Sequence, residues 1–206
     1  MTNKAKDVAH LLLEHEAVIL NPNEPFTWAS GIQSPIYCDN RQLISVPSAR
    51  REVAEALATL IRTHFPDVTV VAGTATAGIP HAAWVSEILD LPMIYIRGEA
   101  KDHGRKTQVE GKLAKEDKVV IIEDLISTGG SVLDAVKAVQ DDCQVLGAVA
   151  IFTYGMSRAA ANFKEAGVAY HCVTDFPTLL EVAAAEERLS TEEIEAVEAW
   201  HQDFTK

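Results

Sequence analysis

The chain has 206 residues, of which 48% are hydrophobic and 23% are charged, a composition that predicts a globular protein with a buried core. No stretch approaches the roughly 18 consecutive apolar residues that a membrane-spanning helix requires, so we expect no membrane partner. Thirty acidic residues against 18 basic ones give a formal net charge of −12. This charge disfavours nonspecific binding to nucleic acid or anionic membranes, so an anionic ligand would have to be held by local groups.

Both the first residues and the cysteines favour a cytoplasmic protein. The start, Met1 to Asp7, is polar and leads into a helical pattern, which is not the pattern of a secretory signal. Cys38, Cys143 and Cys172 are odd in number and far apart, and they lack the spacing of a zinc site or a disulfide framework. We therefore expect free thiols in a reducing compartment.

From the N-terminus, residues 4–20 predict an amphipathic helix, and residues 21–41 an irregular segment rich in Pro, Asn, Ser and Gly. Residues 47–65 carry apolar side chains at helical spacing. Beyond them, short β-branched strands alternate with helices, which is typical of an α/β protein with a doubly wound, largely parallel sheet. The predicted elements of this part are strands over 68–72, 93–97, 118–122, 145–153 and 168–173, and helices over 79–89 and 132–139.

The last predicted element is a helix that begins with a capping box. In Ser190-Thr-Glu-Glu193 the serine and glutamate side chains can each accept a hydrogen bond from a backbone amide at the start of a helix to about Asp203. Neither terminal segment is long enough to bury a core alone. We therefore expect one domain over residues 1–206, with about five strands and a small hood made mainly of residues 1–45 and the C-terminal helical segment.

The motif with the most specific chemistry spans residues 119–131, VVIIEDLISTGGS. Four apolar residues form a buried strand, the carboxylates of Glu123 and Asp124 follow at its carboxyl end, and a Ser/Thr/Gly loop opens a helix. Open α/β sheets bind ligands at this end of their strands. The amides and hydroxyls of 127–131 can hold a phosphate, and the two carboxylates can accept hydrogen bonds from a vicinal diol. The motif suits a phosphorylated ribose; the alternative is an ordinary junction with solvated acids.

Three other segments have less specific patterns. Residues 97–106, RGEAKDHGRK, contain five basic residues in a polar connection, which suits a lid that stabilises a departing diphosphate but also an ordinary solvated loop. Residues 72–80, AGTATAGIP, suit a second anion loop and equally a plain turn before a helix. Residues 26–41, with Trp28 and Tyr37, could form any ordered surface loop.

These segments together resemble a known family. Residues 119–131 resemble the motif with which type I phosphoribosyltransferases bind 5-phosphoribosyl-1-diphosphate (PRPP), and residues 26–41 and 97–104 resemble the orotate phosphoribosyltransferases of that family. The resemblance implies the type I phosphoribosyltransferase fold and transfer of the 5-phosphoribosyl group from PRPP to orotate in pyrimidine biosynthesis. It also implies Mg²⁺ bound through PRPP without a protein ligand, and a homodimer with active sites shared across the interface.

The same resemblance implies roles for individual residues. Glu123 and Asp124 would hold the ribose hydroxyls, while Lys101 and His103 would act in catalysis from a loop that reaches the partner subunit's site. The implied PRPP contacts are Arg97, Lys101, His103, Glu123, Asp124, Leu125, Ile126, Ser127, Thr128, Gly129, Gly130 and Ser131. The implied orotate contacts are Ser127 and Tyr37, and the implied diphosphate loop contains Thr74, Thr76 and Gly78.

This chain departs from the family where lysines are common. Ala29, Ala77 and Gly98 stand at such positions. In place of a lysine at Ala29, a charge contact to diphosphate or orotate must come from elsewhere, with Arg41 as the candidate. We expect the loop with Ala77 to work without its own charge, and Arg105 or Lys106 to replace the lysine missing at Gly98. Two other functions stay open: a phosphoribosyltransferase for another base, which residues 26–41 argue against, and a PRPP-sensing regulator that binds nucleic acid. The regulator would need a basic face or an added DNA-binding module, and neither the net charge of −12 nor the terminal segments supply one.

Overall fold

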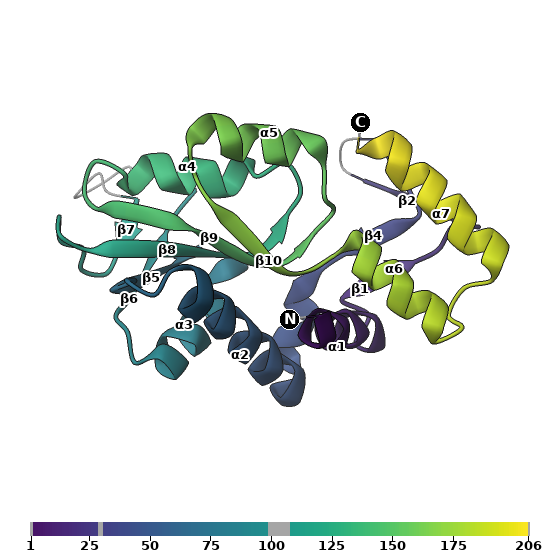
Figure 1. Cartoon of the computed structure of the whole chain (residues 1–206), viewed down its shortest axis with the longest axis horizontal. Helices are drawn as coiled ribbons and strands as arrows, with labels where there is room; N and C mark the ends of the chain where they lie inside the picture. The colour runs from purple at the N-terminus through teal and green to yellow at the C-terminus, as the bar shows by residue number, and fades with distance from the viewer. Residues whose placement is uncertain (1, 29–30, 99–107, 206) are drawn as a thin grey trace.

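The computed structural model describes residues 2–28, 31–98 and 108–205. Its centre is a six-stranded sheet in the order β10-β9-β8-β5-β6-β7, in which β7 runs antiparallel to β6 and the other neighbours run parallel (Figure 1). The strands are β5 (Val70–Thr74), β6 (Met93–Ile96), β7 (Val109–Glu110), β8 (Lys118–Ile126), β9 (Gln144–Thr153) and β10 (Tyr170–Asp175). The five predicted strands are confirmed, whereas the two residues of β7 are too few to carry a periodic pattern.

Helices cover both faces of the sheet. The helices are α2 (Pro47–His64) and α3 (Gly78–Leu89) on one face, and α4 (Gly130–Val139) and α5 (Ser157–Ala166) on the other (Figure 1). Successive side chains of a strand point to opposite faces, so Val120 and Ile122 share a core with α2 and α3, while Val119 and Ile121 share one with α4. None of the described helices is both long and apolar enough to span a membrane.

The two ends of the chain fold together beside β10 (Figure 1). The N-terminal elements are α1 (Thr2–Glu14), β1 (Val18–Leu20), β2 (Phe26–Thr27), β3 (Gln33–Ser34), β4 (Ile36–Cys38) and the 3₁₀ helix η1 (Asn40–Ser45). The C-terminal ones are α6 (Phe176–Ala185) and α7 (Thr191–Phe204). Helix α1 packs against α6 and β10, and its buried residues belong to the same core as those of α2.

The predicted helix over 4–20 is wrong at its C-terminal end. Helix α1 ends at Glu14, Glu16 adopts a left-handed φ of 54°, and Val18–Leu20 pairs antiparallel with β4. A residue with positive φ cannot continue a right-handed helix, and the side chains of β1 suit a strand. The segment 21–41, predicted as irregular, contains the short strands β2, β3 and β4, whose two or three residues leave no clear alternation.

Helix α7 confirms the predicted capping box. The Ser190 hydroxyl accepts from the Glu193 amide, and the Glu193 carboxylate accepts from the Ser190 amide. The helix also contacts the hairpin formed by β2 and β3: the Trp200 indole donates to the Gln33 carbonyl over 3.0 Å, and the ring centroids of Trp28 and Trp200 lie 6.1 Å apart. The last helix is thus joined to a segment near the beginning of the chain.

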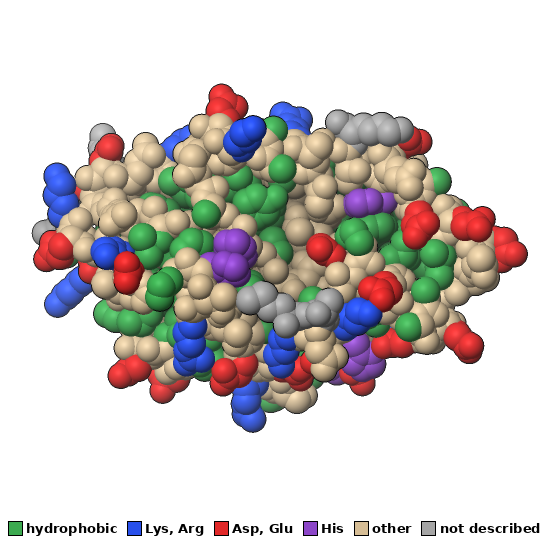
Figure 2. All heavy atoms as spheres, in the orientation of Figure 1, with side chains coloured by type: hydrophobic (Ala, Val, Ile, Leu, Met, Phe, Trp, Pro, Cys, Tyr) green, Lys and Arg blue, Asp and Glu red, His purple; other side chains and the backbone are tan. Residues whose placement is uncertain are grey.

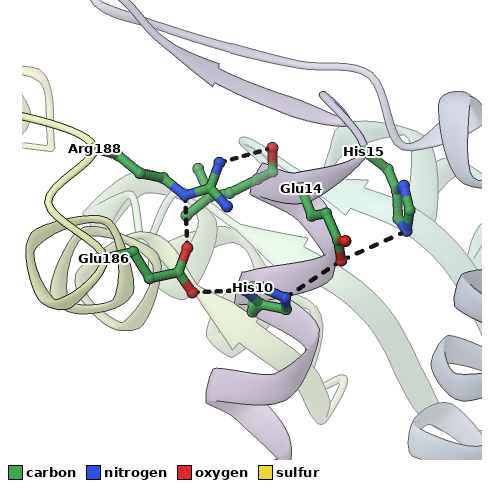
Figure 3. A network of polar contacts seen from close by, with 6 residues as sticks. His10, Glu14, His15, Glu186 and Arg188 are labelled. Atoms are coloured by element: carbon green, nitrogen blue, oxygen red, sulfur yellow. Dashed lines mark hydrogen bonds and ion pairs between the residues drawn. The ribbon is translucent and has the colours of Figure 1, made fainter.

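A network of polar contacts joins α1 to the connection between α6 and α7 (Figure 3). His10 Nδ1 lies 2.6 Å from Glu186 Oε1, and His10 Nε2 lies 3.3 Å from Glu14. Arg188 donates to the second oxygen of Glu186 over 2.6 Å and to the Leu13 carbonyl over 3.3 Å. Acidic side chains gather over the end of the molecule formed by α6 and α7 (Figure 2). The contacts of the network are partly exposed, and exposed contacts between charged side chains each contribute little to stability. The network therefore mainly orients α1 relative to the connection between α6 and α7.

Candidate functional site

The acidic pair of the 119–131 motif lies at the carboxyl end of β8. Strand β5 accompanies β8 only as far as Ile122, whereas β9 stays paired with β8 to Ile126. Glu123 and Asp124 therefore lie where the neighbouring strand has already ended, which is the place where open α/β sheets bind ligands. The side chain of Ile126 is buried in the core and that of Leu125 is half-buried, so these two residues can offer a ligand mainly their backbone.

Glu123 is buried and is held by two hydrogen bonds. Its Oε1 accepts from the Asp124 amide and its Oε2 from the Ser131 hydroxyl, each over 3.0 Å. Burial, together with the neighbouring Asp124 carboxylate, raises the pKa of Glu123 to about 8. In the free protein near neutral pH this acid is therefore largely protonated. Its bond to Ser131 ties the end of β8 to the first turn of α4.

The loop over 127–129, which joins β8 to α4, is supported by α5. Gly129 adopts a φ of 81°, and a Cβ there would lie only 2.5 Å from the Phe163 ring, so glycine is required both by the backbone and by the contact. Asn162 donates to the Thr128 carbonyl over 2.9 Å. Ser127 and Thr128 are half-buried, and Gly130 and Ser131 are exposed. A loop fixed in this way at a helix N-terminus can receive a phosphate on its amides.

The loop over 75–77, between β5 and α3, packs directly on β8. The Thr74 hydroxyl is buried and donates to the Ile122 carbonyl over 3.2 Å, and a Cβ on Gly78 would lie 2.4 Å from the same carbonyl oxygen. Thr76 is exposed, and the peptide bond between Ala75 and Thr76 is cis. The structure thus places Thr74 and Gly78 in the support of the loop and leaves Thr76 at its surface.

The basic segment 97–106 begins at the edge of the sheet. The Arg97 amide donates to the Gln108 carbonyl over 2.8 Å, and the Gln108 side chain donates back to the Arg97 carbonyl over 3.0 Å. Arg97 Nη1 also lies 3.6 Å from Glu110. The two ends of the connection between β6 and β7 therefore meet beside Arg97. Lys101 and His103 lie outside the described residues.

The segment 26–41 reaches the end of β8 through Asn40. This side chain is fully buried, and its Nδ2 donates to the Asp124 carbonyl over 2.7 Å. Tyr37, three residues earlier, is 42% exposed, and its ring lies 5.6 Å from that of Phe26. A planar ligand could therefore lie against Tyr37 close to the acidic pair. Ala29 lies outside the described residues.

Three residues near the site carry no signal in the sequence. Asn40 and Asn162 each bind a backbone carbonyl of the motif, a role that follows no spacing rule. His81 on α3 is fully buried, and neither of its ring nitrogens has a hydrogen-bond partner within the described part of the chain. Burial lowers the pKa of His81 to about 4, against an opposing effect of the Asp124 charge. The imidazole is therefore neutral at physiological pH and adds no positive charge to the site.

The structure brings most of the predicted site residues to one end of the sheet. The acidic pair, the loop 127–131 and the loop after β5 meet at the end of β8, and the segment that carries Tyr37 joins them through Asn40. An acidic pair between two anion loops can bind a sugar diol that carries a phosphate on either side. This arrangement suits a doubly phosphorylated ribose.

Comparison with known proteins identifies the family. Residues 40–173 match the model of the phosphoribosyl transferase domain. The chain is 54% identical over 197 residues to an orotate phosphoribosyltransferase of Halalkalibacterium halodurans, an alignment that covers 95% of this chain and 94% of the relative.

Two solved structures have the same fold. The orotate phosphoribosyltransferase of Aeropyrum pernix superimposes with a TM-score of 0.75 at 29% identity, covering 84% of this chain and 96% of that one. The UMP synthase of Leishmania donovani superimposes with a TM-score of 0.84 at 28% identity, covering 98% of this chain but 43% of that longer one. The expected type I phosphoribosyltransferase fold is confirmed. With a relative at 54% identity over nearly its full length, the chain belongs to the orotate phosphoribosyltransferases, which are pentosyltransferases.

Proposed function

We propose that this chain transfers the 5-phosphoribosyl group of PRPP to N1 of orotate, giving orotidine 5′-monophosphate and diphosphate in pyrimidine biosynthesis. This function rests on the arrangement at the end of β8. The acidic pair lies there between two loops, and each loop is joined to β8 by a side-chain hydrogen bond. Such a place suits a ribose with a 5′-phosphate and a 1-diphosphate. The shared name of the relatives supports orotate as the base.

The contacts of the two substrates follow from this placement. Glu123 and Asp124 accept hydrogen bonds from the ribose hydroxyls, and the amides and hydroxyls of 127–131 hold the 5′-phosphate. Thr76 and the amides of its loop face the diphosphate, together with Arg97. Orotate lies between Tyr37 and Ser127. These roles are supported by the exposure of Thr76 and Tyr37 and by the half-buried position of Ser127.

The reaction is a displacement at the anomeric carbon. The bond from C1′ to the diphosphate oxygen breaks, and the bond to N1 of orotate forms as N1 loses its proton to the departing diphosphate or to solvent. Positive charge develops on the ribose ring in between. The acidic pair, which carries the charge of Asp124 and that of Glu123 when it is ionised, stabilises this positive charge, and cations around the diphosphate stabilise the negative charge on the departing oxygen. The protein therefore acts by orientation and electrostatics, without a covalent intermediate.

We further propose that Mg²⁺ enters with PRPP. The described residues contain no cluster of three or more metal-ligating side chains, and both oxygens of Glu123 already accept hydrogen bonds. We propose that the ion would be held by the substrate rather than by protein side chains. It would lower the negative charge of the diphosphate.

Replacing Asp124 with Asn should lower kcat/KM for PRPP on the order of 10- to 100-fold, because the ribose hydroxyls lose a charged acceptor. The fold should survive, since the hydrogen bond from Asn40 goes to the backbone carbonyl of residue 124. Steady-state kinetics with varied PRPP measure the effect. Asp134→Asn is the control, because Asp134 lies exposed on the next helix. An unchanged kcat/KM in Asp124→Asn would contradict the proposed contact with ribose.

Replacing Lys101 with Ala should lower kcat on the order of 10²-fold, since its charge stabilises the departing diphosphate. We propose that Lys101 and His103 act in the partner subunit's site of a homodimer. Mixing Lys101→Ala with Asp124→Asn protein should then restore part of the activity, because one site of the mixed dimer has both native residues. No recovery after demonstrated subunit exchange would contradict the shared site.

A turnover assay with PRPP and orotate, followed by the loss of orotate absorbance, tests the reaction and separates it from both alternatives. A transferase for another base would leave orotate unchanged, and a PRPP-sensing regulator would bind PRPP without turnover.

We propose that residues 1–206 act as one domain with the hood described from the sequence, and that the enzyme works in the cytoplasm. The three free cysteines support a reducing compartment.

A further inference from the structure

The segment that carries Tyr37 also holds a fixed cation. Arg41 donates to Asp39 through Nε over 2.6 Å and through Nη2 over 3.0 Å, a two-pronged contact that orients the guanidinium plane. The Asp39 side chain is only 13% exposed, whereas that of Arg41 is 63% exposed. Within the described part of the chain, Nη1 of Arg41 has no hydrogen-bond partner. One edge of the Arg41 guanidinium is therefore held by Asp39, and Nη1 on the other side is available to a ligand.

The position of this pair is set by Asn40, which lies between its two members in the sequence. Because the Asn40 side chain binds the Asp124 carbonyl, the backbone of 39–41 runs directly beside the end of β8. The negative charge of Asp124 favours the charged guanidinium of Arg41 and is one of the causes that raise its pKa, after the contact with Asp39. Arg41 thus lies at the rim of the site, on the same segment as the aromatic ring against which the base is proposed to lie.

The neighbouring groups leave a need for positive charge there. Asp39 and Asp124 are acidic, burial raises the pKa of the Cys38 thiol, and His81 is neutral, so none of them can attract an anion. Orotate differs from uracil by a carboxylate on the pyrimidine ring, and a carboxylate that leaves water requires a cation or several donors. A guanidinium offers both, with a geometry that matches a carboxylate.

We propose that Arg41 binds the carboxylate of orotate and of its product, and that Asp39 positions the guanidinium for that contact. The inference rests on the proposed function, because it takes orotate as the base. Two other described cations follow strands at this end of the sheet. Arg97, after β6, lies beside Glu110, and Arg158 is in the first turn of α5. Arg41 differs from both because it shares a segment with Tyr37 and is fixed beside Asp124.

The test compares two nucleotides that differ only in the carboxylate. Wild-type protein and the Arg41→Gln variant are titrated calorimetrically with orotidine 5′-monophosphate and with uridine 5′-monophosphate. Arg41→Gln should weaken binding of the orotidine nucleotide on the order of 10-fold, with binding of the uridine nucleotide unchanged within about twofold. Arg41→Lys should lose less, since it keeps the charge but not the fork. In turnover, KM for orotate should rise while KM for PRPP stays constant.

Three variants complete the experiment. Asp39→Asn should also weaken binding of the orotidine nucleotide more than that of the uridine nucleotide, but by a smaller factor than Arg41→Gln. The guanidinium remains in this variant but is no longer fixed. Arg62→Gln, on the exposed side of α2, removes an arginine charge elsewhere and should change neither affinity. Arg158→Gln tests the rival cation and should leave the difference between the two nucleotides intact.

Several results would overturn the assignment. Equal losses for both nucleotides in Arg41→Gln would place the contact on the phosphate or the ribose, and no loss would remove it altogether. A carboxylate-selective loss confined to Arg158→Gln would transfer the role to Arg158. Wild-type protein that makes no orotidine 5′-monophosphate would instead refute the proposed function. The two failures are distinguishable, because the nucleotide titrations require no turnover.

Discussion

A Glu123→Gln enzyme should be more stable than the wild type at alkaline pH and far less active. The buried acid has a pKa of about 8 in the folded protein, against an ordinary value of 4.5. Glutamine is neutral at every pH and fits the same contacts, since its carbonyl can accept from the Asp124 amide and its amide can donate to the Ser131 hydroxyl. The variant therefore removes the cost of ionising a buried carboxyl without leaving a cavity.

The pH dependence has a definite sign. Because the folded-state pKa of Glu123 is raised, its contribution to stability is fully present below about pH 4.5 and is lost as the pH rises through 8. The free energies of unfolding of variant and wild type should be similar near pH 4.5. They should diverge as the pH rises, with the free energy of unfolding of the variant higher on the order of 4 kcal/mol by pH 8. Urea unfolding at several pH values measures the difference.

Activity should move in the opposite direction. Glutamine cannot become the carboxylate that we propose for the contact with the ribose hydroxyls and for stabilising the developing positive charge, so kcat/KM for PRPP should fall on the order of 10²-fold. Glu55→Gln, exposed on α2, serves as the control for the loss of one carboxyl. A variant that loses activity but gains no stability at high pH would show that Glu123 is not strained by burial in the free enzyme.

Replacing Gly78 with Ala should destabilise the protein by roughly 2 to 4 kcal/mol and weaken PRPP binding at least tenfold. The new Cβ would lie 2.4 Å from the Ile122 carbonyl oxygen and 2.5 Å from the Thr74 hydroxyl. The first of these atoms belongs to the central strand and cannot move aside, so the start of α3 must shift. That shift would displace the loop over 75–77. Thermal unfolding and PRPP titration measure the two effects.

The direction of the stability change in Gly78→Ala is informative, because Gly78 is the first residue of helix α3. In an exposed helix interior, alanine is more favourable than glycine by about 1 kcal/mol. Gly98→Ala is the matched control for stability, since a Cβ there meets no atom of the described residues within 4 Å. A stabilised Gly78→Ala protein would mean that the loop yields easily and does not depend on close contact with β8.

The sheet could be predicted from the sequence because its strands repeat a simple pattern. Residues 119–122 are apolar without interruption, as expected of a strand covered on both faces. The same argument places the end of β8 too early. Glu123 and Asp124 have the composition of a loop, yet they continue the ladder with β9 to Ile126. Their pairing depends on a neighbouring strand that local sequence does not reveal.

The site could be predicted only where its residues are contiguous. The acidic pair and the following loop form one motif, and so does the loop after β5. Asn40 lies 84 residues from the carbonyl that it binds, and its partner atom is backbone, so no pairing of residue types marks the contact. The burial of His81 likewise depends on how α3 packs in three dimensions.

The hydrogen bond from Trp200 to Gln33 also bears on the order in which the enzyme matures during synthesis. The strands and helices of the sheet emerge from the ribosome early and can pack while translation continues. The hairpin of β2 and β3 emerges earlier still, whereas Trp200 of the covering helix follows Gln33 by 167 residues. The segment that we propose for base binding therefore stays uncovered until α7 has been made. A nascent chain stalled before α7 would have the strands and loops that we propose for PRPP binding and still lack the cover over this hairpin.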